Sequence, residues 1–298
     1  MREGLRVSIT LSGLARLFGD ELSAVTELAS AAEAAGIDQI AVPDHLAIGP
    51  RTDRYPYGRF PLPPDEPWLE PLTLLAALAG ATRRIRLATG VLIAPLRPAL
   101  LLAKTVATLD VLSGGRVDLG VGLGWQREEF AGAGVPFAGR AARLDDQLRA
   151  CRALWSGEKV SFHSETVSFE DLICRPRPVQ PGGPPLWFGV AASERNAARI
   201  AELGAGWLPM ESDPEAIARG IALLRRAFER AGRDPASLLV RANAPVATGA
   251  AGRPDLDATL KALPRLREAG VTVAGFALAR FVSSRDQLQS FFERLAGG

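Results

Sequence analysis

The fold of this 298-residue chain is decided by the stretch Arg116-Val-Asp-Leu-Gly-Val-Gly-Leu-Gly-Trp125. Successive side chains of a strand point to opposite faces. One face of this stretch is apolar, and the other has almost no side chains: Val117, Leu119, Val121 and Leu123 against Asp118, Gly120, Gly122 and Gly124. The apolar face predicts packing against helices. Glycine in a strand often marks a close approach by another group, so we predict that a flat ligand lies near the carboxyl end of this strand.

The stretches on either side alternate between strand-like and helix-like patterns. Eight segments have strand character: Leu5–Leu11, Ile37–Pro43, Ile85–Leu92, Val117–Leu123, Pro185–Val190, Gly206–Met210, Leu238–Thr248 and Val271–Leu278. Each is followed by helical spacing: Glu21–Ala35, Pro71–Ala79, Pro98–Leu112, Arg140–Trp155, Glu194–Leu203, Pro214–Ala231, Leu256–Ala269 and Arg285–Leu295. Eight such units predict an α/β fold, the (β/α)8 TIM barrel. The alternative is an open doubly wound sheet, but no G-x-G-x-x-G turn follows the first strand.

Two interruptions of this rhythm predict insertions after strands 2 and 4 of a single barrel domain covering residues 1–298. The first, at about 45–70, is rich in proline and aromatic residues. It follows the second strand, so it should lie over the C-terminal mouth of the barrel, where barrel enzymes place their sites. The second, at about 158–184, contains a predicted hairpin around His163–Thr166.

The bulk composition favours a globular protein that binds neither nucleic acid nor membrane. The formal net charge is only +2, and 47% of the residues are hydrophobic. No apolar run reaches the length of a membrane span, and no signal-peptide pattern opens the chain. Cys151 and Cys174 are the only cysteines, too few for a disulfide framework. We therefore expect a cytoplasmic protein.

One histidine is placed for chemistry. His45 directly follows the second strand, and strand parity turns it into the lumen together with Gln39, Ala41 and Pro43. A histidine at the C-terminal end of a barrel strand can transfer protons or bind a ligand; the alternative is a structural histidine bonded to a carbonyl. His45 beside Asp44 offers too few ligands for zinc, so we predict no metal site. No G-x-S-x-G is present, which argues against a hydrolase of that type.

Three further features carry weaker signals. Thr89-Gly90-Val91 ends the third strand, where glycine indicates a bulge, a close approach or a plain turn. Gly189-Val190-Ala191-Ala192-Ser193 leads from a strand into a helix, and its main-chain N–H groups suit an anion. Asp118 should face the lumen, either as a paired core carboxylate, which we favour, or as a ligand contact.

Taken together, these stretches resemble the luciferase-like monooxygenase superfamily of (β/α)8 barrels, and within it the deazaflavin (F420)-dependent oxidoreductases. The similar blocks span nearly the whole chain and keep their order: 34–45, 84–92, 103–116 with the Gly-rich strand, 128–130, 153–155 and 201–207.

The resemblance implies roles by position. His45, after Asp44, would lie beside the isoalloxazine-type ring. Gly90-Val91, after Thr89, would form a non-prolyl cis peptide and a bulge that backs the ring. Gly122 and Gly124 would flank the ring, with Trp125 and Gln126 beside them. The segment Gly189, Val190, Ala191, Ala192 and Ser193 would bind the cofactor phosphate, although relatives carry paired glycines where Val190 follows Gly189 here. Some F420 relatives carry a Glu acid where this chain has Trp125, which leaves His45 as the candidate catalytic residue.

The implied function is an F420-dependent oxidoreductase that transfers hydride between C5 of the deazaflavin and a small organic substrate. The close alternative is an FMN-dependent luciferase-like monooxygenase that uses O2. A more distant alternative is a non-catalytic flavin-binding protein. The expected partners are a small-molecule substrate, a second copy of the chain in a homodimer, and a flavin or F420 reductase that supplies reduced cofactor.

Overall fold

The computed structural model describes residues 4–249 and 252–297. Within them, eight parallel strands form a closed ring, because the sheet runs in the order β3-β2-β1-β11-β10-β9-β8-β5 and β3 also pairs with β5. Around the ring these are β1 (Arg6–Thr10), β2 (Gln39–Val42), β3 (Arg86–Thr89), β5 (Val117–Gly122), β8 (Leu186–Gly189), β9 (Gly206–Trp207), β10 (Leu239–Asn243) and β11 (Val273–Ala277). The predicted (β/α)8 barrel is confirmed.

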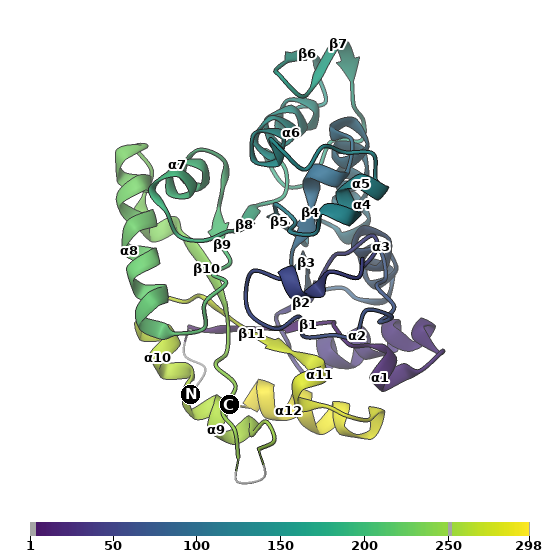
Figure 1. Ribbon diagram of the computed structural model, residues 1–298, viewed down its shortest axis with the longest axis vertical. Coiled ribbons are helices and arrows are strands. Elements are labelled where there is room, and N and C mark those ends of the chain that lie inside the picture. Colours follow the sequence, from purple (N-terminus) through teal and green to yellow (C-terminus); the bar gives the residue numbers. More distant parts are fainter. Residues whose placement is uncertain (1–3, 250–251, 298) are drawn as a thin grey trace.

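Helices surround this ring (Figure 1). The longer ones are α2 (Val25–Ala34), α3 (Pro71–Ala81), α4 (Ala99–Ser113), α6 (Arg140–Trp155), α7 (Glu194–Leu203), α8 (Pro214–Arg230) and α12 (Leu288–Gly297). Shorter ones are α1 (Ala15–Phe18), α5 (Arg127–Gly132), α9 (Leu256–Lys261), α10 (Leu263–Glu268) and α11 (Leu278–Phe281). Several helices begin at a side-chain N-cap: Ser193 accepts a hydrogen bond from the N–H of Asn196, and Asp213 accepts one from Ala216. Such caps satisfy main-chain donors that a helix leaves free.

Three predicted elements are shorter or broken. The third strand ends at Thr89, and a separate short strand, β4 (Leu92–Ile93), resumes after Gly90 and pairs with β5. The strand predicted to reach Thr248 ends at Asn243, ahead of Pro245, which cannot donate to a ladder. The helix predicted over Leu256–Ala269 divides at Ala262, where Pro264 starts a new first turn.

Both insertions lie where they were predicted. Residues 45–70 connect β2 to α3 and contain a 3-10 turn, η2 (Thr52–Arg54). The second insertion follows α6 and contains the antiparallel pair β6 (Lys159–His163) and β7 (Ser168–Ile173). This hairpin projects at the top of Figure 1, away from the strand ring.

The parity predicted for the Gly-rich strand is also found. Val117, Leu119 and Val121 are fully buried in the hydrophobic core that contains the inner faces of the helices. Asp118 points into the lumen, where it accepts hydrogen bonds from Gln39 and Arg86. The favoured interpretation of Asp118 as a paired core carboxylate therefore agrees with its contacts.

Candidate functional site

His45 is buried at the end of β2 and is bound to a carboxylate that the sequence did not single out. Its Nδ1 lies 3.1 Å from Oε2 of Glu129 on α5, and Oε1 of Glu129 accepts the main-chain N–H of Leu46 at 2.6 Å. An ionised carboxylate is an acceptor only, and with Glu129 in that form the contact has its hydrogen on Nδ1. Within the described residues Nε2 makes no hydrogen bond, and it is therefore the ring atom left for a substrate.

Aromatic rings surround this histidine. The centroid of the His45 ring lies 4.8 Å from that of Trp68, 5.8 Å from Phe60 and 5.9 Å from Trp125, each in an edge arrangement. Tyr55 contacts Phe60 and Trp125. Burial raises the pKa of the Tyr55 phenol, so this hydroxyl stays protonated at neutral pH. Most of these rings come from residues 45–70, which confirms that this insertion lies over the mouth beside His45.

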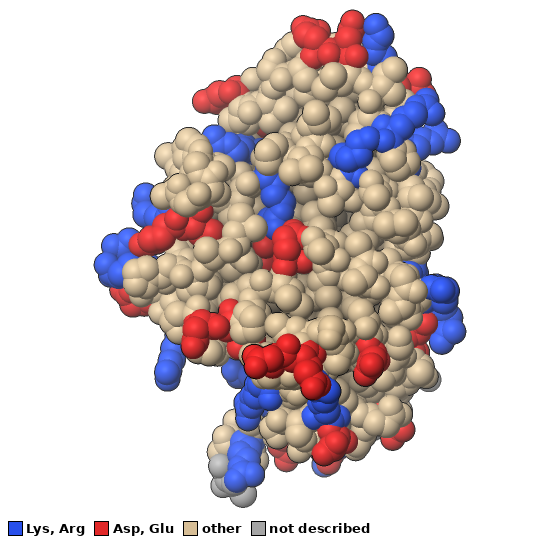
Figure 2. Space-filling model, turned by 90° about the vertical axis from the view of Figure 1, so that its right-hand side faces the viewer, with Lys and Arg blue, Asp and Glu red and all other residues tan. Residues whose placement is uncertain are grey.

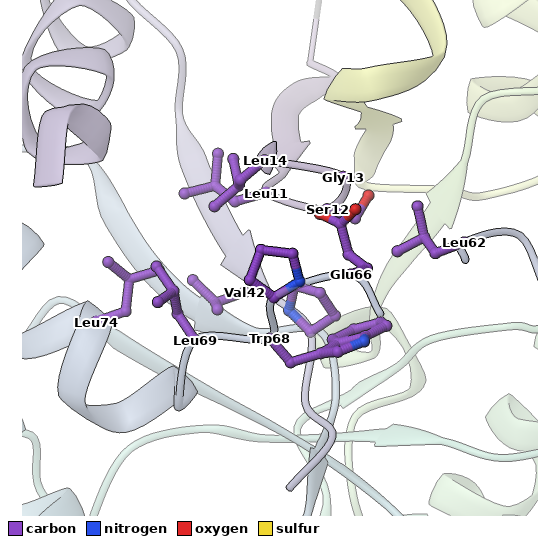
Figure 3. A pocket seen from close by; sticks show the side chains of 12 residues that line it. Leu11, Ser12, Gly13, Leu14, Val42, Leu62, Glu66, Trp68, Leu69 and Leu74 are labelled. Atoms are coloured by element: carbon purple, nitrogen blue, oxygen red, sulfur yellow. The ribbon is translucent and has the colours of Figure 1, made fainter. Parts of the chain in front are cut away.

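A small pocket lies beside Trp68, where this insertion packs against the barrel (Figure 3). Leu11 and Val42, at the ends of β1 and β2, face Leu69 and Leu74 across it. Trp68 lines this pocket and its ring also contacts that of His45, while its Nε1 is buried without a hydrogen-bond partner among the described residues. The pocket therefore lies where the end of the insertion meets the barrel.

Two predicted cofactor-binding residues make structural contacts through their side chains. The carboxylate of Asp44 accepts the N–H of Ile93 at 2.7 Å and pairs with Arg97 at 2.6 Å. The amide of Gln126 bonds both main-chain groups of Gly49, at 2.8 and 3.2 Å. Because both side chains are already committed, Asp44 supports β4 and Gln126 supports the start of the insertion. Neither offers a free polar atom to a cofactor.

Arg97 extends the Asp44 contact to α3. It also pairs with Glu70 at 2.9 Å. Burial alone would lower the pKa of the Arg97 guanidinium, but the carboxylates of Asp44 and Glu70 raise it above its ordinary value. This half-buried cation therefore joins the end of β2, β4 and the start of α3, the elements on both sides of the insertion.

The peptide between Gly90 and Val91 is cis, as the resemblance implied. The resulting bulge enters the lumen beside the Gly-rich strand. A Cβ built on Gly120 would lie 2.1 Å from the carbonyl oxygen of Thr89, and one built on Gly122 would lie 2.6 Å from Cγ2 of Val91. One built on Gly189 would lie 2.8 Å from Cγ1 of Val91.

These distances show which group makes the close approach that the glycines predict. It is the chain's own bulge, and the flat ligand expected near the end of the strand stays a prediction. Gly124 is equally enclosed, since a Cβ there would lie 2.7 Å from Ile93 and 2.8 Å from Phe130. The glycines thus make room for the bulge, and Val91 becomes the surface that the bulge presents to the lumen.

The segment 189–193, predicted to bind an anion, leads from β8 to the start of α7. Val190 is buried, and its carbonyl accepts the indole N–H of Trp207 at 2.8 Å. Ala191, Ala192 and Ser193 are exposed at the start of α7. Their main-chain N–H groups donate no hydrogen bond to any described residue. Such free donors at a helix N-terminus attract anions.

The structure thus brings His45, Trp125 and the Gly90–Val91 bulge to the carboxyl ends of β2, β3 and β5. Aromatic side chains surround His45 at this place, and the bulge adds the apolar side chain of Val91. Sequence reasoning missed Glu129 and Arg97 as supports. The one signal in the sequence that could have identified Glu129 is its position, because it follows the Gly-rich strand at the same end of the barrel as His45.

Residues 4–249 and 252–297 contain neither a candidate metal-binding group nor a candidate membrane-spanning helix. No group of three or more His, Cys, Asp and Glu side chains is arranged to bind a metal ion. No helix in that part of the chain combines the length and the apolar character needed to cross a membrane.

The amino-acid sequence is similar to those of known proteins. An uncharacterized protein of Mycobacterium tuberculosis (strain ATCC 25618 / H37Rv) is 36% identical over 269 residues, covering 89% of this chain and 90% of that protein. The FMNH(2)-dependent dimethylsulfone monooxygenase of Pseudomonas putida is 33% identical over 141 residues, covering 46% of this chain and 38% of that enzyme.

A solved structure shows the same fold. The coenzyme F420 dependent tetrahydromethanopterin reductase from Methanopyrus kandleri superposes with a TM-score of 0.74 at 17% identity, covering 98% of this chain and 97% of that chain. The family match covers residues 5–271. The chain therefore belongs to the luciferase-like monooxygenase family, a family with oxidoreductases among its members.

Proposed function

We propose that this protein is an F420-dependent oxidoreductase that moves hydride between C5 of the deazaflavin and a small organic substrate. The observation that carries the proposal is the His45–Glu129 pair, buried under aromatic rings at the barrel mouth beside the Gly90–Val91 bulge. The bound cofactor would supply the hydride chemistry, and the protein would supply position and electrostatics.

The chain's own residues would position the ring from two sides. Val91 and Thr89 would back one face, and Trp125 would lie beside the ring edge. Gly122 and Gly124 would act indirectly, by making room for the bulge and for Ile93. The free N–H groups of residues 191–193 would bind the cofactor phosphate at the start of α7.

His45 would serve the proton side of the reaction. With the hydrogen of Nδ1 directed to Glu129, Nε2 would accept a proton from a substrate hydroxyl, or return one to a carbonyl in the reverse direction. Transfer by a positioned histidine contributes about 10²–10⁴-fold to rate. The aromatic residues of the insertion would exclude water while this transfer takes place.

An FMN-dependent monooxygenase is the second candidate. It is favoured by the 33% identity to the FMNH(2)-dependent dimethylsulfone monooxygenase. In that case O2 would be a co-substrate, and a partner reductase would supply reduced flavin. The same bulge, aromatic rings and phosphate segment would serve either ring system.

A titration of the purified apoprotein with F420 and, separately, with FMN decides between them. We expect saturable changes in absorbance with F420 and only weak binding of FMN. Turnover of reduced F420 with a panel of small ketones and alcohols would then define the reaction. Tight binding of FMN together with O2 consumption would replace our first proposal by the second, and binding of neither ring would reject both.

We also infer that the chain forms a homodimer through α4. The outer side of this helix carries two exposed apolar pairs, one near each end: Leu101 and Leu112 are 59% and 61% exposed, and Leu100 and Val111 are exposed beside them. Lys104 and Thr108 are exposed between the two pairs. Figure 2 shows the side of the molecule to which α3 and α4 belong, where charged side chains are scattered over an otherwise uncharged surface. Exposed apolar surface marks interaction sites.

A further inference from the structure

Arg241 is a buried cation in the barrel lumen that the proposed mechanism does not use. It comes from β10, and only 6% of the residue is exposed. Its Nε donates to Oγ of Ser8 at 3.0 Å, and its Nη2 donates to Oγ1 of Thr10 at 2.6 Å. A guanidinium has five N–H donors. Three of them, including both on Nη1, have no hydrogen-bond partner among the described residues.

A second buried arginine shows how this chain satisfies a guanidinium whose role is structural. Arg116, at the start of β5, is 9% exposed and also lacks an ion pair with any described carboxylate. Its five donors reach five acceptors, namely the carbonyls of Ala79, Thr82, Ile85 and Ser113 and the hydroxyl of Thr82. Arg241 has two acceptors where Arg116 has five, so a purely structural role does not explain its three unused donors.

No carboxylate within the described residues neutralises Arg241. Asp118 attracts its charge, but no hydrogen bond or ion pair joins the two side chains. Asp118 is already bound to Arg86 and Gln39. Burial lowers the pKa of Arg241 to about 10, so the side chain is still a cation at neutral pH. An uncompensated buried charge is costly, and a bound anion would offset that cost.

The free end of Arg241 lies at the floor of the candidate site. A Cβ built on Gly90 would lie 3.7 Å from Nη1, and one built on Gly275 would lie 3.2 Å from Nη2. Gly90 belongs to the bulge, so the guanidinium spans the lumen from β10 to the end of β3. The side chain of Asn243 lies beside Nη2, because the same Cβ on Gly275 would lie 2.9 Å from its Oδ1, but no hydrogen bond among the described residues joins it to Arg241.

We propose that Arg241 binds an anionic oxygen of the molecule held in the barrel, with Ser8 and Thr10 fixing its orientation. This deepens the proposed function, on which it rests for the location of the site, by stating which charge the ligand carries. The oxygen has two sources with the same chemistry. It belongs either to a carboxylate, sulfonate or phosphate on the substrate, or to the pyrimidine edge of the cofactor ring, which becomes negative on reduction.

The first arm of the test uses the apoprotein without cofactor. Calorimetry would compare methanesulfonate with its neutral analogue dimethyl sulfone, at constant ionic strength. If the substrate supplies the oxygen, wild-type protein binds the anion and not the sulfone, and Arg241→Met weakens anion binding at least tenfold. Arg149→Met removes the same charge from an exposed surface pair with Glu202 and should leave anion binding unchanged.

The second arm measures the Kd of the oxidised and reduced forms of whichever ring binds. If the ring supplies the oxygen, the reduced form binds more tightly, and Arg241→Met lowers the ratio of the two Kd values at least tenfold. Arg241→Lys keeps a charge in place and should retain part of the effect, which covers the case in which Arg241→Met does not fold.

The two arms separate the outcomes. If Arg241→Met weakens anion binding in the first arm, the substrate supplies the anionic oxygen. If it lowers the Kd ratio in the second arm, the cofactor ring supplies that oxygen. Anion affinity and a Kd ratio that are both independent of Arg241 would overturn the proposal. If neither F420 nor FMN binds, the proposed function fails, and the first arm alone then decides whether Arg241 binds an anion.

Discussion

At the scale of single residues, the proposed chemistry depends on one imidazole and one carboxylate. Strand parity was sufficient to predict that His45 faces the lumen. Its partner Glu129 lies 84 positions later on a short helix, and only the closed barrel brings the two together. The following predictions separate what each residue does.

Replacing His45 tests its proton-transfer role directly. We expect His45→Ala to retain cofactor affinity and to lose turnover by about 10²–10⁴-fold, measured by steady-state kinetics with the cofactor identified by titration. His163→Ala is the matched control, because His163 lies exposed in the β6–β7 hairpin. Undiminished turnover in His45→Ala would remove His45 from the mechanism.

The role of Glu129 is to fix the tautomer of His45. In Glu129→Gln, the side-chain oxygen would remain with the N–H of Leu46 and the NH2 group would face Nδ1. The hydrogen of His45 would then move to Nε2, and turnover would fall by about 10²–10⁴-fold, the range expected for a misoriented or wrongly protonated base.

Nitrogen-15 NMR can detect this change without cofactor, since the chain has only two histidines and His163→Gln leaves one signal set. We expect a hydrogen on Nδ1 of neutral His45 in the wild type and on Nε2 in Glu129→Gln. The neighbouring Glu128→Gln is the control. An identical tautomer in all three proteins would refute a positioning role for Glu129.

The contact between Gly122 and Val91 makes a packing prediction. Gly122→Ala places a methyl 2.6 Å from Cγ2 of Val91, so we expect a loss of about 1–3 kcal/mol in unfolding free energy and weaker cofactor binding; Gly122→Leu would be worse. Val91→Ala removes the opposing methyl groups. Urea unfolding should therefore show that the double variant is more stable than the sum of the single effects. Strict additivity would mean that the bulge does not occupy this space.

At the scale of elements, the start of α3 connects helix capping to the candidate site. Glu70 is the N-cap of α3, where it accepts the N–H of Thr73 at 2.7 Å, and it also pairs with Arg97. Burial alone would raise the pKa of Glu70, but the hydrogen bond from Thr73 and the pairing with Arg97 lower it below its ordinary value.

The sign of the pH effect follows from this lowered pKa. The stabilisation is fully present above the unfolded-state pKa of about 4.3 and is lost as the pH falls through the folded-state value. Glu70→Ala should therefore cost about 1 kcal/mol at pH 7 and less in acid, as measured by urea unfolding at both pH values. Equal costs at pH 7 and below pH 4 would show that the charge of Glu70 contributes nothing.

At the scale of the whole molecule, the closed ring leaves no exposed strand edge, and the remaining apolar surface on α4 is available for assembly. We expect sedimentation to show a dimer at micromolar concentration. The double substitution Leu101→Lys and Leu112→Lys should yield a folded monomer, because it places charge on the predicted interface. Ala222→Lys and Ala231→Lys, at exposed positions of α8 and its C-cap, are the control. A monomeric wild type would refute the interface.

The sequence by itself determined the barrel, since the eight-fold alternation of strand and helix patterns depends on local periodicity and on caps such as Ser193. It also determined which face of the strand over 117–122 points inward, because strand parity is a local property. Only the tertiary structure decided what fills the glycine positions, which carboxylate holds His45, and which donors of Arg241 stay unused. Those answers depend on contacts between residues far apart in the chain, and such contacts exist only once the ring is closed.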